Sequence, residues 1–210
     1  MNFSSNPQQQ NKEIPTKAEG NWIEHPLTLE SDNYCLLPLE MEHFKDLLEI
    51  SKDKRIWEFY IVDGSNSEKL LQSWNTAMIE RKEGNQYPFV IKTKKDNKII
   101  GSTRFLNIQP EHKKLEIGWS WIHPNYWNTN ANKECKKLIL TYIFETLKAN
   151  RVQLQTDENN IRSRKAIEKI GGKFEGILRH DIIRENGVFR NSVYYSIINS
   201  EWAEIKNCLG

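Results

Sequence analysis

Two short runs of basic residues lie where the chain is expected to begin helices. Positive side chains are unfavourable at a helix N-terminus, because the aligned peptide dipoles already place partial positive charge there. A bound phosphate or pyrophosphate would reverse that preference, since free backbone N–H groups also converge at a helix start. The alternative interpretation is that both runs are solvated faces of ordinary helices. The six basic residues are Lys133, Lys136, Lys137, Arg162, Arg164 and Lys165.

The segments that precede the two runs are compatible with an anion site. Asn128-Thr129-Asn130-Ala131-Asn132 forms a short loop between a strand that ends at His123-Pro124 and the next helix, because proline stops ladder pairing. Asn160 precedes the second run and is a natural N-cap, whose side chain could accept an N–H from Arg162 or Ser163. Capping alone is the alternative role for Asn160.

The elements that position these segments alternate between strand and helix. Residues 114–122 are patterned as a strand, 133–148 as a helix, 151–156 as a second strand and 163–170 as a second helix. A helix that crosses between the two strands makes them parallel neighbours. Both basic helix starts then lie at the carboxyl edge of the sheet, where open α/β sheets bind ligands. Two such starts beside one crevice indicate a long, phosphate-bearing ligand.

The remaining pattern predicts one mixed α/β domain over residues 22–210, preceded by a polar, disordered tail over residues 1–21. The other expected elements are strands at 33–39, 88–93 and 98–106, helices around Met41–Leu48 and Leu70–Met78, and a closing hairpin that turns at Asn186-Gly187. The apolar face expected for the helix 133–148 consists of Cys135, Leu138, Ile139, Tyr142 and Leu147.

Composition excludes several classes of function. The 30 Lys and Arg against 28 Asp and Glu give a net charge of +2, which argues against nucleic-acid binding. Three Cys without CxxC spacing and five His without an HExxH pair argue against disulfide and metal frameworks and favour a reducing compartment. GxGxxG, GxxxxGK[ST] and GxSxG motifs are missing. We expect no signal peptide, no membrane span and a cytoplasmic location.

Three stretches resemble a known family. EIGWSWIHPNYW (116–127), RVQLQTDENNIRSRKAIEKIGGKFEG (151–176) and the closing hairpin are similar to the GCN5-related N-acetyltransferase (GNAT) superfamily. Within it they resemble the branch named for the Rim-type ribosomal-protein N-terminal acetyltransferases, over residues 26–205. The most specific pattern is N-x-x-S-x-x-x-x-E-K-x-G, which is met here by Asn160, Ser163, Glu168, Lys169 and Gly171.

The resemblance implies a GNAT fold, with a mixed, mostly antiparallel seven-stranded sheet flanked by helices. Strands 114–122 and 151–156 would form its one splayed parallel pair, with acetyl-CoA in the wedge between them and no metal. The implied cofactor contacts are Trp121 and Ile122 for pantetheine, Asn128, Thr129, Asn130, Ala131, Asn132 and Lys133 for pyrophosphate, and Asn160, Ser163 and Lys165 at the second helix. The family's loop normally carries glycines, whereas this loop has asparagine, the other residue that best holds a positive φ.

The resemblance also implies direct attack of an amine on the acetyl thioester. Glu116, on the strand that lines the cleft, is the candidate general base, either directly or through a water; an ordinary strand residue is the alternative. Ser163 matches the position beside the sulfur and could protonate the leaving thiolate, which needs only a weak acid. A backbone N–H of strand 114–122 would bind the oxyanion.

Aromatic residues supply candidate acceptor contacts. Trp119 and Trp121 alternate with Ser120, so both face one side of the sheet. Trp57, Tyr60 and Trp74 come from the helical region that covers the acceptor side in this family. Trp57, Tyr60, Trp74 and Trp119 are therefore the expected acceptor-binding residues, with core packing as the alternative.

Three functions remain open. The favoured one is an N-acetyltransferase, an acyltransferase that acts on the α-amine of a peptide or protein N-terminus. The second is acetylation of a small amine such as an antibiotic or polyamine. The third is a catalytically weak acyl-CoA-binding protein. The expected partners are acetyl-CoA and the amine acceptor, with neither nucleic acid nor membrane, and the chain is expected to be a monomer or homodimer.

Overall fold

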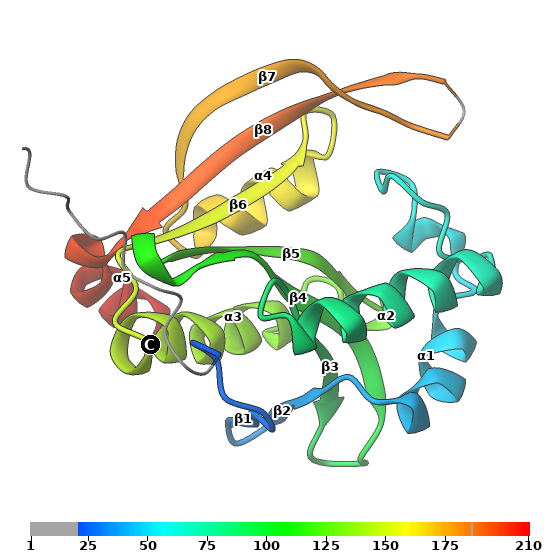
Figure 1. The fold of residues 1–210 in the computed structure, drawn as a ribbon, viewed down its shortest axis with the longest axis horizontal. Helices are drawn as coiled ribbons and strands as arrows, with labels where there is room; N and C mark the ends of the chain where they lie inside the picture. Colours follow the sequence, from blue (N-terminus) through cyan, green and yellow to red (C-terminus); the bar gives the residue numbers. More distant parts are fainter. Residues whose placement is uncertain (1–20, 186) are drawn as a thin grey trace, which may run out of the picture.

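The structure, a computed structural model, describes residues 21–185 and 187–210. Residues 1–20 of the expected tail lie outside the described residues, as does Asn186 of the predicted turn. The described residues form one twisted sheet with helices on both faces (Figure 1). None of the described helices is both long and apolar enough to span a membrane.

The sheet contains eight strands among the described residues, in the order β1-β2-β3-β4-β5-β6-β8-β7. The expected number was seven, and the additional strand is the two-residue β1, which is too short to give a period-2 signal. All neighbours are antiparallel except β5 and β6. The strands are β1 (Leu29–Glu30), β2 (Tyr34–Pro38), β3 (Tyr87–Thr93), β4 (Ile99–Gln109), β5 (Lys114–Ile122), β6 (Arg151–Asp157), β7 (Lys173–Ile183) and β8 (Phe189–Ile198).

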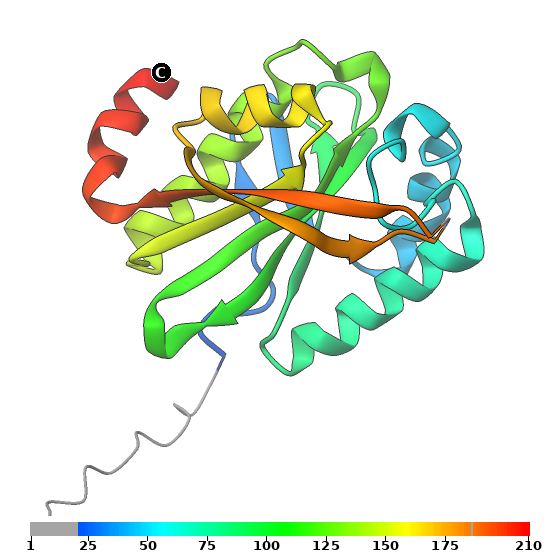
Figure 2. The ribbon, with the colours of Figure 1, turned by 90° about the horizontal axis from the view of Figure 1, so that it is seen from above.

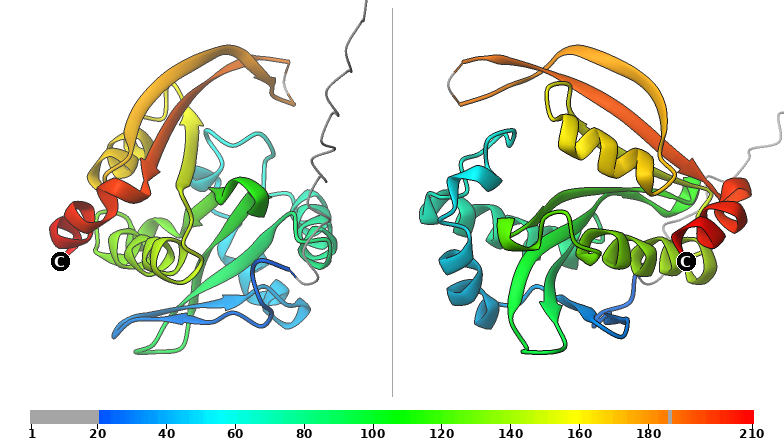
Figure 3. Two further views of the ribbon diagram at one scale, coloured as in Figure 1. Left: turned by 60° about the vertical axis from the view of Figure 1, so that its left-hand side comes forward. Right: turned by 180° about the vertical axis from the view of Figure 1, so that it is seen from behind.

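The helices divide between the two faces of the sheet (Figures 2 and 3). Helices α1 (Phe44–Ile50) and α2 (Ser67–Lys82) pack on one face, around the fully buried Trp74. Helices α3 (Ala131–Thr141), α4 (Ile161–Lys169) and α5 (Trp202–Leu209) cover the other face. The strands supply both cores because alternate side chains point to opposite faces: Val90 joins the first core, and Phe89 and Ile91 join the second.

The predicted helix 133–148 is confirmed in place, but its buried face differs from the expected one. Helix α3 continues into a π-helical turn over Tyr142–Thr146. A π turn holds more residues than an α turn and therefore rotates the face that follows it. Ile143 and Phe144 consequently enter the core, whereas Tyr142 and Leu147 are only partly buried.

The parallel strands β5 and β6 pair only at their beginnings. Their register runs from Lys114 opposite Arg151 to Ile117 opposite Leu154, and residues 118–122 of β5 then pair with β4 alone. A bulge in β5 coincides with the separation, because Trp119 and Ser120 both stand opposite Thr103 of β4. Trp119 adopts a φ of 47° at this bulge. The splay that the resemblance implied is thus present.

The hairpin β7–β8 extends past the sheet towards the side that carries α2 (Figure 1). Its end is tied down there, because Arg184 donates to the backbone oxygen of Glu58 at 3.2 Å and Glu185 pairs with Lys69 of α2 at 2.5 Å. Gly187 has a φ of 79°, which fits the turn expected at this place. The hairpin therefore spans the opening between the two halves of the sheet.

Candidate active site

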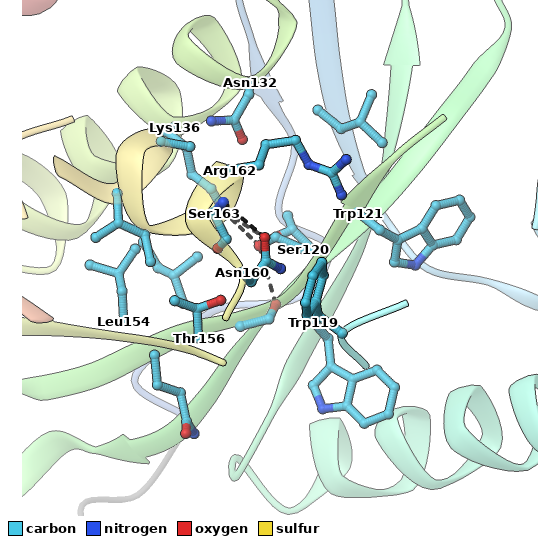
Figure 4. A pocket seen from close by; sticks show the side chains of 18 of the residues that line it. Trp119, Ser120, Trp121, Asn132, Lys136, Leu154, Thr156, Asn160, Arg162 and Ser163 are labelled. Carbon is cyan, nitrogen blue, oxygen red and sulfur yellow. Dashed lines mark hydrogen bonds between the residues drawn. The ribbon is translucent and has the colours of Figure 1, made fainter. Parts of the chain in front are cut away.

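A cavity of about 480 Å³ opens where β5 and β6 separate. That volume is within the usual range for small-molecule and cofactor sites. It is bounded by β5, β6, the starts of α3 and α4, and the segment 56–61 (Figure 4). The expected site residues that line it are Tyr60, Glu116, Trp119, Trp121, Ile122, Asn128, Thr129, Asn132, Lys133, Asn160, Ser163 and Lys165.

The loop before α3 has a backbone that suits an anion. Asn128 holds a φ of 59°, the conformation for which asparagine is the best substitute for glycine. Thr129 fixes the turn, since its hydroxyl donates to the oxygen of Tyr126 at 2.7 Å and accepts from the N–H of Ala131 at 3.2 Å. Asn130 and Ala131 do not line the cavity themselves. The next N–H groups belong to the first helical turn, where no intrahelical acceptor exists.

The start of α4 faces the same cavity. Asn160 caps it by accepting the N–H of Ser163 at 3.0 Å, one of the two donors expected from the sequence. Ser163 is half-buried and lines the cavity. Its hydroxyl makes no hydrogen bond with another described residue, so it is available to a ligand.

Arg162 at the start of α4 contacts Trp127 in the segment before α3, and we call this pair the clasp. The guanidinium of Arg162 lies 3.6 Å above the ring of Trp127, a cation–π contact across the cavity mouth. The indole Nε1 of Trp127 donates to the backbone oxygen of Ile122 at 2.7 Å. Trp127 therefore occupies part of the β5 edge that was expected to meet pantetheine.

Among the six basic residues of the two runs, Lys136 departs most from its expected position. Rather than lying on a solvated face, it is 6% exposed and points to the strands beneath the cavity (Figure 4). Its Nζ donates to Ser120 Oγ at 2.7 Å and to Thr103 Oγ1 at 3.3 Å, and no carboxylate of the described chain pairs with it. Burial lowers the pKa of Lys136 to about 8. Arg164 also leaves the expected anion edge, because its side chain binds Tyr195 and the backbone of Glu158.

Glu116 lies at the base of the wedge and is 2% exposed. Its Oε2 accepts from Asn107 at 2.9 Å and Gln153 at 3.1 Å, and its Oε1 accepts from Gln155 at 2.9 Å. Because a carboxylate oxygen can accept two hydrogen bonds, an amine or an ordered water would meet Glu116 at Oε1, which accepts only from Gln155 among the described residues. The carboxylate of Glu116 is thus fixed in place by three side-chain amides.

The four aromatic residues expected on the acceptor side separate into two pairs. Trp119 and Tyr60 line the cavity with ring centroids 6.1 Å apart, and the hydroxyl of Tyr60 donates to the oxygen of Ser120 at 2.6 Å. Trp57 and Trp74 lie in the core instead, 5% and 0% exposed, and neither lines the cavity. Trp121 faces the same side as Trp119, as expected, and contacts Trp57 at 5.3 Å between centroids.

Sequence reasoning missed a cluster of charges under the hairpin. Arg190 of β8 is 8% exposed and lines the cavity beside Asp157 of β6. Asp157 binds Arg184, the residue that follows β7, and also accepts the N–H of Asn159 at 2.8 Å. Arg104 is likewise buried, with its guanidinium 4.7 Å from the ring of Trp119. A charge in the middle of a strand pattern was the only available signal for either arginine, and it does not reveal which cavity the side chain faces.

Comparison with known proteins relates this geometry to one family. Residues 33–173 match the family described as Acetyltransferase (GNAT) domain. The protein p20 of Bacillus licheniformis, named as an uncharacterized N-acetyltransferase, is 24% identical over 84% of this chain and 98% of its own length. "Putative ribosomal N-acetyltransferase YdaF" of Bacillus subtilis is 36% identical over 51% of this chain and 57% of its own length.

Solved structures share the fold. A GCN5-related N-acetyltransferase from Brucella melitensis is 23% identical, with a TM-score of 0.80 over 89% of this chain and 85% of that one. Mycobacterium smegmatis RimJ in complex with CoA-disulfide is 17% identical, with a TM-score of 0.74 over 88% of this chain and 94% of that one. A spermidine N-acetyltransferase from Vibrio cholerae, in complex with CoA and spermine, is 17% identical, with a TM-score of 0.69 over 82% and 99%.

Proposed function

Since this chain belongs to the GNAT acetyltransferase family, we propose that it transfers the acetyl group of acetyl-CoA to a primary amine, with a peptide or protein N-terminal α-amine as the favoured acceptor. The chain is an acyltransferase of the GNAT type. The observation that carries the proposal is the wedge between β5 and β6, because two helix starts and one unpaired strand edge face a single cavity there.

The residues around the wedge fit acetyl-CoA. Beyond Ile117, β5 has lost β6 as a partner, so its backbone groups can pair with the amides of pantetheine. The positive φ of Asn128 replaces the backbone freedom of the missing loop glycines. Lys133 and Lys165 stand beside the two helix starts, and the phosphates would draw on both the helix dipoles and these charges. Acetyl-CoA would supply the activated acyl group.

The proposed reaction needs a donor to the oxyanion, a proton donor to the thiolate and a proton acceptor for the amine. The proposed oxyanion donor is a backbone N–H of β5 beside the bulge at Trp119, because fixed backbone donors are well suited to stabilise that charge. Ser163 is the proposed proton donor for the departing thiolate; because a hydroxyl is a weaker acid than a thiol of pKa near 8.5, it would give up its proton only as it takes up the proton that the acceptor nitrogen releases. Glu116, acting through an ordered water, remains the proposed acceptor of the proton that the amine loses.

An α-amine is favoured as acceptor on two grounds. Its pKa of about 7.7–8.0 lies well below that of a lysine side chain, so a larger fraction is neutral and reactive near pH 7. YdaF is named for ribosomal acetylation, and the fold is also that of RimJ. The likeness to a spermidine N-acetyltransferase keeps a polyamine acceptor as the second candidate.

Release of free CoA thiol over a set of acceptors tests the proposal. We expect turnover with peptides that have a free N-terminus and little with the same peptides after N-terminal blocking. Spermidine and aminoglycosides belong in the same assay, and faster turnover with either would replace the peptide assignment. If acetyl-CoA binds but no acceptor releases thiol, the chain is a CoA-binding protein without transferase activity.

A further inference from the structure

We propose that the amine acceptor carries an anionic group, a carboxylate or a phosphate, close to the reacting amine and that Arg190 binds it. The inference rests on the proposed acetyl transfer and adds the charge of the acceptor to it. For a peptide acceptor, the anionic group would belong to one of the first residues.

The first observation is that Arg190 is incompletely paired. Its side chain is buried and lines the cavity, and its Nε makes no hydrogen bond in the described chain. The nearest carboxylate oxygen is Asp157 Oδ2, 3.7 Å from that Nε. This distance permits attraction but is too long for a hydrogen bond.

The second observation is that Asp157 is paired more closely with Arg184 than with Arg190. One of its oxygens accepts the N–H of Asn159, and the other accepts from the guanidinium of Arg184. Arg190 is left with the longer contact to Asp157 and with the more distant charge of the exposed Asp181, and neither gives its Nε a hydrogen bond. Arg184 is the closer guanidinium partner of Asp157. It also donates to the backbone oxygen of Glu58 and so joins the hairpin to that segment.

The third observation is the sign of the charges around Tyr60. Burial raises the pKa of the Tyr60 hydroxyl, and the charges that oppose this rise are those of Arg104, Arg162 and Arg190. Arg104 pairs with no carboxylate in the described chain; it donates to Ser73 Oγ at 2.9 Å and covers the ring of Trp119. The acceptor wall formed by Tyr60 and Trp119 is thus backed by positive charge.

The carboxylates near the cavity leave Arg190 incompletely paired. Glu116 is held by three amides, Asp157 accepts from Arg184, and Glu58 and Asp181 are exposed. A polyamine would bring further positive charge against the arginines. A carboxylate or phosphate instead matches the planar guanidinium, which can donate two parallel hydrogen bonds.

Arg190 belongs to the acceptor side rather than to the pyrophosphate side. It lies on β8 opposite Ile182 of β7, under the hairpin, whereas Lys133 and Lys165 stand at the helix starts that receive phosphates. An anion bound by Arg190 therefore belongs to the acceptor and not to acetyl-CoA.

The test uses peptides that differ only at the second residue, with Glu, Gln, phosphoserine or Lys at that position. The full-length wild-type enzyme should show a kcat/KM for the Glu or phosphoserine peptide about tenfold above that for Gln, because a hydrogen bond to a charged group carries that much discrimination. The Lys peptide should be the poorest. The Glu and phosphoserine arms distinguish the two anions.

Arg190→Gln should remove the preference, so that the Glu and Gln peptides react alike while the KM for acetyl-CoA stays unchanged. Arg190→Lys keeps the charge and should retain part of the preference, which separates loss of charge from loss of folding. Arg179→Gln, an exposed arginine on the same hairpin, is the matched control and should behave as wild type.

The inference is wrong if wild type does not favour the anionic peptides, or if Arg190→Gln slows all peptides by one factor. Binding of the N-acetylated peptides, measured by calorimetry, gives a readout without turnover. Tighter binding of the Glu product to wild type than to Arg190→Gln would support the anion site even if acetyl transfer itself failed. Equal binding with normal turnover would overturn the anion site and leave the acetyltransferase assignment in place.

Discussion

At the scale of single residues, Lys136 shows most directly how the site departs from an ordinary core. A buried ammonium without a carboxylate costs folding free energy, and the cost is reduced here only by two hydroxyl acceptors. Its pKa is about 8 in the folded chain, against 10.5 for the free side chain. The difference corresponds to roughly 3 kcal/mol of lost stability at neutral pH.

The replacement Lys136→Met tests this cost. Between pH 8 and 10.5 the unfolded chain holds a proton that the folded chain has released, so wild-type stability should rise with pH across this window. The variant should lack this rise and should be more stable than wild type at pH 7 by roughly 3 kcal/mol at most. The hydroxyls left behind keep their mutual contact at 2.7 Å. Urea unfolding at several pH values measures the difference, with Lys137→Met as the control; parallel curves for wild type and Lys136→Met would contradict the assignment.

Ser163→Ala tests the second residue-scale assignment. If the hydroxyl protonates the thiolate, kcat at pH 7 should fall by roughly tenfold to a hundredfold, as for other proton-transfer groups. The loss should shrink above pH 8.5, where the thiolate leaves without a proton. Steady-state kinetics at pH 7 and pH 9 give both values. A defect of equal size at the two pH values, or a change confined to the KM for acetyl-CoA, would assign Ser163 to binding instead.

At the scale of elements, the clasp between the start of α4 and the loop before α3 controls access to the strand edge. Trp127 binds the oxygen of Ile122 and supports Arg162, so it has to adjust when pantetheine pairs along β5. We expect Trp127→Ala to raise the KM for acetyl-CoA by roughly fivefold to tenfold, because the cation–π contact of about 1 kcal/mol or more that holds the Arg162 guanidinium at the cavity mouth, where it can meet the phosphates, is lost.

The conservative variant Trp127→Phe keeps the stacking of Arg162 and loses only the indole N–H. It should therefore retain most of the affinity for acetyl-CoA. Isothermal titration with acetyl-CoA compares the variants. If Trp127→Ala binds acetyl-CoA as tightly as wild type, the clasp plays no part in cofactor binding.

The elements also show what the sequence could predict. Strand 114–122, the parallel pair and the Asn160 cap follow from local pattern and connectivity, and the structure confirms them. The burial of Lys136 could not be predicted, because a charge beside Cys135 in a helical repeat fits a solvated face equally well. Trp57 and Trp74 are aromatic and come from the region that covers the acceptor side in this family, which predicts a place in the acceptor wall, whereas their burial depends on which side of the α1–α2 layer each ring enters.

At the scale of the whole molecule, the sheet consists of two halves joined by a short stretch of pairing between β5 and β6. In the described chain their strand pairing runs from Lys114–Arg151 to Ile117–Leu154, and the hairpin contacts of Arg184 and Glu185 join the halves from the other side. A ligand that fills the wedge contacts both halves and should therefore stabilise the folded chain as a unit. The expected gain is about 2.7 kcal/mol at a concentration 100 times the dissociation constant.

Thermal unfolding with a ligand series tests this expectation and locates the dominant contact. Acetyl-CoA and CoA should each raise Tm by roughly 5–10 °C at saturation, given the size of the domain. Pantetheine, which lacks the pyrophosphate, should give little shift at the same concentration, because the two helix starts carry the anion-binding groups. Added salt should weaken the effect of CoA through screening of Lys133 and Lys165. If pantetheine stabilised as much as CoA, the strand edge of β5 rather than the helix starts would be the main binding surface, and the basic runs would be solvated faces after all.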